Sequence, residues 1–207
     1  MTKVLIPIAS VLLLFCTCAV QIASAGRISQ TQVIDFSSPD SDIDVREGAC
    51  WAVSIAAPRA GAWRCTIGNA VYDPCFNVAN KSKRLVCEAD PVRGRAGFIL
   101  KMAGPPPAEA PTPDLRVAAH PWVFTLENGL ACYAMTGTVA MTKTGQPAPW
   151  SCVRTIGERA EPAGAVTSIE TGKVWTAKYF AESMLGPPPA LSARLKSQQI
   201  PIVKAWR

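Results

Sequence analysis

The chain has 207 residues, of which 49% are hydrophobic and 17% are charged. This balance excludes a disordered tether, because disordered chains combine low hydrophobicity with high charge. The formal net charge of +6 does not indicate a nucleic-acid-binding protein, since no recognised binding motif accompanies it.

The N-terminal residues 1–25 are predicted to be a secretory signal peptide. Lys3 precedes an apolar stretch at 4–22, and the small residues at 23–25 form an Ala-x-Ala cleavage site. This site, together with Pro7 inside the apolar stretch, favours cleavage over retention as a membrane anchor. We therefore expect a mature protein that is periplasmic or extracellular and that has no transmembrane segment.

A Gly-Pro-Pro-Pro-Ala string occurs twice, at 104–108 and at 186–190. Each copy lies at the same distance from an upstream Cys-aromatic-Ala motif, which begins at Cys50 in one half and at Cys132 in the other. The offset predicts a tandem duplication with a period near 82 residues. A proline-dense stretch is typical of an extended spacer. We therefore expect a first β module at 26–103, a proline-rich linker at 104–114 and a second β module at 115–207.

Both modules are predicted to be mainly β. Short segments rich in β-branched and aromatic residues alternate with turn formers, and Asn128-Gly129 is typical of a tight hairpin turn. One short C-terminal helix is predicted at 190–198, where Leu191 and Leu195 lie four residues apart. The predicted strands are 31–36, 51–56, 62–67, 84–87, 97–102, 121–126, 130–135, 150–156, 165–169 and 173–180.

Six cysteines follow the predicted signal peptide, and an even number in an exported chain predicts a disulfide framework. Both halves contain a Trp-x-Cys motif downstream of the Cys-aromatic-Ala motif. If the halves are equivalent, the pairs are Cys50–Cys65 and Cys132–Cys152, which leaves Cys75–Cys87. The nested pairing of Cys50 with Cys87 and of Cys65 with Cys75 stays open, because spacing alone does not decide between them.

Candidate contact residues come from charge and aromatic content. Basic residues cluster at Lys81, Lys83 and Arg84, and again at 93–95. Such clusters indicate either a salt-sensitive contact with anionic polymers or the solvated tip of a hairpin. The six tryptophans are expected to pack against disulfides and within small cores, although an exposed indole would suit a glycan.

The sequence offers few candidates for catalytic or metal-binding residues. His120 is the single histidine, and no Gly-x-Ser-x-Gly motif is present to activate a serine. Oxidised cysteines supply neither a thiolate nucleophile nor a zinc ligand set. The acidic residues at 40, 42 and 44 lack the glycine and the closing glutamate of a calcium loop. We therefore predict no metal and no cofactor.

The motifs Cys50-Trp51, Trp63-Arg64-Cys65 and Asp73-Pro74-Cys75-Phe76 resemble those of a family of uncharacterised secreted bacterial proteins with a Cys-Trp, Trp-Arg-Cys and Asp-Pro-Cys-Phe signature. The resemblance covers most of residues 48–206. It implies an extracytoplasmic location and no nameable activity.

The sequence favours a non-catalytic binding or interaction module at the cell envelope. Its partner would be an anionic envelope polymer or another protein, and not a nucleic acid. One alternative is a small secreted hydrolase that uses His120 with a nearby serine or carboxylate. A less favoured alternative is a protease inhibitor that presents Arg59 from the predicted Cys50–Cys65 loop.

Overall fold

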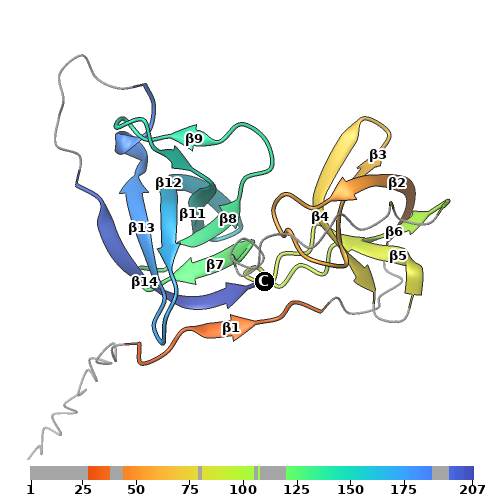
Figure 1. Cartoon of the computed structure of the whole chain (residues 1–207), viewed down its shortest axis with the longest axis horizontal. Coiled ribbons are helices and arrows are strands. Elements are labelled where there is room, and N and C mark those ends of the chain that lie inside the picture. Colours follow the sequence, from red (N-terminus) through yellow and green to blue (C-terminus); the bar gives the residue numbers. More distant parts are fainter. Residues whose placement is uncertain (1–27, 38–43, 79–80, 105–106, 108–119, 188–195) are drawn as a thin grey trace, which may run out of the picture.

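The computed structural model describes residues 28–37, 44–78, 81–104, 107, 120–187 and 196–207. Within these ranges the protein is mainly β, and its strands form two closed barrels that lie side by side (Figure 1). The predicted signal peptide and nearly all of the predicted linker lie outside the described residues. So does most of the predicted helix at 190–198. The described residues of that segment, 196–198, are not helical, and Gln198 begins a strand.

The first barrel is a five-stranded antiparallel meander that is closed by a parallel pairing between its first and last strands. Alternate side chains enter the barrel, as expected for strands with one face on a core. The interior contains Trp63, Leu85 and Leu100, packed around the buried sulfurs of two disulfides. The strands are β2 (Val45–Val53), β3 (Ala62–Ile67), β4 (Ala70–Val78), β5 (Lys81–Cys87) and β6 (Phe98–Met102).

The second barrel has six strands and closes through an antiparallel pairing of its last strand with its first. Its core includes Phe124, Trp150 and Ile202. The barrel strands are β7 (Val123–Leu126), β8 (Ala131–Ala134), β11 (Trp150–Ile156), β12 (Arg159–Glu170), β13 (Thr176–Ala181) and β14 (Gln198–Trp206). A small hairpin of β9 (Ala140–Met141) and β10 (Pro147–Ala148) precedes β11, and the 3-10 helix η1 (Glu182–Met184) follows β13.

The N-terminal strand β1 (Gln32–Ile34) pairs in parallel with β14. Residues 32–34 therefore belong in space to the second barrel, although their sequence position places them in the predicted first module. Thr31 anchors this strand, because its buried hydroxyl donates to the carbonyl of Ile202 at 2.6 Å and accepts from the N–H of Trp175 at 2.7 Å. The N-terminal segment thus runs along the second barrel before the chain enters the first (Figure 1).

The three disulfides are Cys50–Cys65, Cys75–Cys87 and Cys132–Cys152, as expected if the halves are equivalent. Each one joins directly opposed residues on neighbouring antiparallel strands. The two Gly-Pro-Pro-Pro-Ala strings occupy different places in the two barrels. The first follows β6, the last strand of its barrel, whereas the second follows η1, before the last strand β14.

Candidate functional site

An aromatic cluster joins the two barrels. The ring of Phe36, just after β1, lies 4.9 Å from the ring of Phe76 in the first barrel and 5.6 Å from that of Trp122 at the start of the second. Phe76 and Trp122 are themselves 5.3 Å apart. Because these rings are mostly buried, the cluster fixes how the barrels meet.

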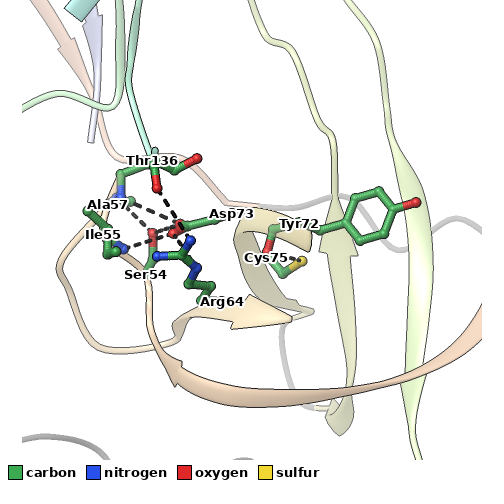
Figure 2. A network of polar contacts seen from close by, with 9 residues as sticks. Ser54, Ile55, Ala57, Arg64, Tyr72, Asp73, Cys75 and Thr136 are labelled. Atoms are coloured by element: carbon green, nitrogen blue, oxygen red, sulfur yellow. Dashed lines mark hydrogen bonds and ion pairs between the residues drawn. The ribbon is translucent and has the colours of Figure 1, made fainter. Parts of the chain in front are cut away.

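Asp73 organises the loop that enters this contact (Figure 2). Its side chain is 0% exposed, and its carboxylate accepts hydrogen bonds from the hydroxyl of Ser54 and from the N–H groups of Ile55 at 3.1 Å and Ala56 at 3.4 Å. The Ser54 oxygen in turn accepts from the N–H of Ala57 at 2.8 Å. Buried carboxylates require such donors, so Asp73 holds the 54–57 turn in one conformation.

Arg64 connects this network to the second barrel. Its Nε lies 3.9 Å from Asp73 Oδ2, and its Nη2 donates to the carbonyl of Thr136 at 3.3 Å. Figure 2 shows the guanidinium between the carboxylate and the Thr136 carbonyl. The hydroxyl of Ser54, the carboxylate of Asp73 and the Nη2 of Arg64 are therefore engaged by the fold itself, although Arg64 Nε has no hydrogen-bond partner among the described residues. These contacts indicate a structural role for the cluster.

Asp90 holds a second loop against the second barrel. Its carboxylate accepts the N–H groups of Val92 at 3.1 Å and Arg93 at 3.2 Å, and Tyr133 of β8 donates its hydroxyl to the same carboxylate at 3.0 Å. Two backbone hydrogen bonds of 2.9 Å between Asp90 and Arg95 close the loop. Burial raises the pKa of the Tyr133 hydroxyl, and the nearby Asp90 charge raises it further.

A cavity of about 780 Å³ lies between this loop, the outer residues of the first barrel and the start of the second. Aromatic side chains supply much of its wall, with Tyr72 edge-on to Phe98 at 5.0 Å. Arg46 lies 4.1 Å from the centre of the Phe98 ring and pairs with Asp44 at 2.7 Å. We call this cavity the inter-module cleft. Its lining includes Arg46, Tyr72, Glu88, Arg95, Phe98, Trp122 and Tyr133.

Two donors in the cleft wall stand out. The indole N–H of Trp122 is buried and has no hydrogen-bond partner among the described residues. The Arg95 side chain is exposed, and no carboxylate in the described ranges lies within ion-pair distance of it. A buried donor without an acceptor is uncommon in folded proteins, so the Trp122 N–H is an unusual feature of a wall that also contains the carboxylates of Asp44, Asp73, Glu88 and Asp90.

The backbone at the cleft rim adopts a restricted conformation. Glu88 has a φ of 57°, a left-handed conformation that costs a non-glycine residue about 1–2 kcal/mol. Gly97, opposite it, has a φ of 76°, and a Cβ there would collide with the carbonyl oxygen of Cys87. The close approach of these two segments requires glycine at 97 and places the Glu88 side chain at the rim.

A second cavity, of about 400 Å³, shares the wall residues Ala56 and Ala134 with the inter-module cleft and is mainly apolar. His120 is in its wall, with its ring 5.7 Å from that of Trp150. Within the described part of the chain, no serine, aspartate or glutamate forms a hydrogen bond with His120. The pairing that the hydrolase alternative requires is therefore not found there.

Two of the three predicted contact residues on β5, Lys83 and Arg84, have described side chains. Lys83 is exposed, whereas Arg84 is half-buried and pairs in register with Lys101 of β6. Neighbouring residues of a strand point to opposite sides, so Lys83 and Arg84 face different ways. The side chain of Lys81 lies outside what the structure describes. Neither Lys83 nor Arg84 lines the inter-module cleft.

Arg59 is not presented to solvent in the manner of an inhibitory loop. Its guanidinium donates to the carbonyl of Phe36 at 2.8 Å and lies 4.9 Å from the centre of the Phe76 ring. Burial lowers the pKa of this guanidinium. Arg59 thus packs onto the aromatic cluster between the barrels, which argues against the inhibitor alternative.

The tryptophans follow the packing prediction with one exception. Five of the six are buried, whereas Trp51 on β2 is 48% exposed. The guanidinium of Arg64 lies 5.7 Å from the centre of the Trp51 ring. Sequence reasoning therefore identified the packing of the indoles but did not identify Trp122 as a cleft residue. The basic cluster at 93–95 was the one sequence signal for the cleft.

A helix able to span a bilayer is not found among the described residues. In comparisons with known proteins, no family model, no curated protein and no solved structure matches the chain.

Proposed function

We propose that this is a non-catalytic exported binding protein and that its ligand site is the inter-module cleft. The ligand class that fits is an anionic segment of an envelope polymer. Three disulfides suit an oxidising compartment, and the predicted signal peptide and the resemblance to secreted bacterial proteins support the same location.

The observation that carries this proposal is the pair of unused donors in the cleft, the Arg95 guanidinium and the Trp122 N–H. A guanidinium binds carboxylate and phosphate groups through two parallel hydrogen bonds. The indole N–H offers a further donor to the same ligand. The half-buried ring of Tyr72 in the wall suits an apolar spacer between charged groups, whereas the ring of Phe98 is buried and already has the Arg46 guanidinium over it.

Co-sedimentation of the chain from residue 26 onward with bacterial wall and membrane fractions tests the proposal. Arg95→Glu should weaken binding about 10-fold or more, because a charge-assisted hydrogen bond contributes about 1.5–3 kcal/mol. Arg159→Glu, at an exposed position on β12, makes the same change in net charge outside the cleft and should leave binding nearly unchanged. Raising the salt concentration should weaken the binding of the unmodified protein.

Two outcomes would contradict the proposal. One is that neither fraction retains the unmodified protein at low salt. The other is that both variants weaken binding equally, which would show that net charge and not the cleft attracts the polymer. Lys83→Glu in the same assay tests whether the basic residues of β5 form an additional contact, which stays a prediction.

A further inference from the structure

The first barrel brings the sulfurs of two different disulfides together. The Sγ atoms of Cys65, Cys75 and Cys87 all lie within 4.8 Å of one another, and all three residues are 0% exposed. Cys65 is bonded to Cys50, which is half-buried, whereas Cys75 and Cys87 are bonded to each other. The Cys50–Cys65 bond is therefore the one that a molecule in solution reaches first. We call these four residues the sulfur cluster.

We propose that the sulfur cluster is a site of thiol–disulfide exchange, entered at Cys50 by an external thiol and leading to alternative pairings within the first barrel. The co-reactant is a small thiol or the thiol of an oxidoreductase. This inference rests on the geometry of the first barrel and is independent of the function proposed for the cleft.

The exchange balances without any net oxidant or reductant. The external thiolate bonds to Cys50, and the electron pair of the broken Cys50–Cys65 bond leaves on Cys65. The Cys65 thiolate then bonds to Cys75, which breaks the Cys75–Cys87 bond and leaves Cys87 as the thiolate. Finally, the Cys87 thiolate attacks Cys50 in the mixed disulfide and releases the external thiolate. The product is the nested pairing that the sequence leaves open, and attack of Cys65 on Cys87 instead gives the crossed pairing.

In the second step, the attack of the Cys65 thiolate on the Cys75–Cys87 bond, the reacting sulfurs already lie close together. Thiol–disulfide exchange requires a thiolate to approach a disulfide sulfur, and here the two reacting atoms start within 4.8 Å. Rotation about the Cα–Cβ bonds covers much of the remaining distance, because side-chain rotamers differ by about 120°. The apolar surroundings disfavour a thiolate, so we expect exchange to be slower than at an exposed disulfide.

The second barrel provides a matched control within the same chain. Cys132–Cys152 likewise joins opposed residues of adjacent strands, and both of its cysteines are buried, as are those of Cys75–Cys87. The second module contains no third cysteine, so a thiolate released there has no neighbouring disulfide to attack.

The test compares Cys50→Ser with Cys132→Ser, each purified without reductant, alkylated in acid and digested. Cleavage before Asp73 separates Cys65 from Cys75, and tryptic cleavage at 81–84 separates Cys75 from Cys87. In Cys50→Ser we expect mass spectrometry to find Cys65 bonded to Cys75 or to Cys87 in a measurable share of molecules. In Cys132→Ser we expect Cys152 to be recovered as the alkylated free thiol. Recovery of Cys65 only as a free thiol beside an intact Cys75–Cys87 bond would overturn the proposal.

A second measurement does not depend on the folding of a variant. The unmodified protein is incubated under native conditions with catalytic reduced glutathione, sampled over time and mapped in the same way. Nested or crossed pairings should accumulate among the four cysteines of the sulfur cluster while Cys132–Cys152 persists. Persistence of the original pairing alone, after the mixed disulfide at Cys50 has formed, would also overturn the proposal.

Discussion

Tyr133 of the second module donates its hydroxyl to the carboxylate of Asp90 in the first module, with an O···O distance of 3.0 Å. The two residues are 43 positions apart in the chain, on opposite sides of the predicted linker. Because Asp90 also accepts two N–H groups of its own loop, this hydrogen bond fixes the loop that carries Arg95 against the second barrel. The position of the main cleft arginine thus depends on a contact between modules.

Removing that contact should destabilise the protein measurably. Tyr133→Phe deletes a hydrogen bond to a charged acceptor, and such bonds contribute about 1.5–3 kcal/mol. Urea unfolding followed by circular dichroism measures the loss. Tyr179→Phe is the matched control, because Tyr179 donates to the neutral carbonyl of Ala163 at 2.6 Å and should cost about 0.5–1.5 kcal/mol. Equal losses in the two variants would argue against a special role for the contact with Asp90.

Stability should fall at alkaline pH. Burial, and then the charge of Asp90, raise the pKa of Tyr133 in the folded protein, so the folded state retains a proton that the unfolded state releases near pH 10. The contribution is fully present below about pH 10 and is lost as the pH rises beyond it. Unfolding free energies measured across this range should decline above pH 10. The decline should be shallower in Tyr133→Phe, and an identical slope in both proteins would contradict this assignment.

Replacing the buried carboxylate of Asp73 should lower the stability of the protein more than replacing an exposed carboxylate. Asp73→Asn replaces one acceptor oxygen with a donor that faces N–H groups and leaves Arg64 without its counter-charge, which should cost about 3 kcal/mol. Asp44→Asn is the control, because Asp44 pairs with Arg46 at the surface and exposed pairs contribute little. Thermal unfolding of both variants checks the difference. Similar melting temperatures would show that the Asp73 network is dispensable.

The sequence predicted most strands because their apolar alternation is local. All ten predicted strands overlap observed strands, and 62–67 and 150–156 match β3 and β11 in full. The strands β9, β10 and β14 were missed, and the central part of β4 was not assigned to a strand. Pro74 lies in the middle of β4 and Pro201 within β14, and a proline inside a run argues against a strand when only the sequence is read.

The candidate site was largely hidden because it depends on contacts between distant segments. Asp90 reads as the start of a turn and Tyr133 as a strand residue, and nothing in either local pattern indicates that they meet. The parallel pairing of β1 with β14 joins residues about 170 positions apart, for which no local periodicity exists. The disulfide pairing was easier to predict, because the similar cysteine motifs at Cys50 and Cys132 gave a reason to prefer one pairing.

The attachment of β1 to the second barrel should depend on the hydroxyl of Thr31. Thr31→Val keeps the shape of the side chain but leaves the buried N–H of Trp175 and the carbonyl of Ile202 without this partner. An unsatisfied buried polar group costs about 1–3 kcal/mol, so we expect a loss of that size in urea unfolding and faster hydrogen exchange along β1. Thr66→Val is the control, since its hydroxyl makes a 3.5 Å contact at the surface and its loss should change stability by less than about 0.5 kcal/mol. If both variants unfold at the same urea concentration as the unmodified protein, Thr31 does not anchor β1.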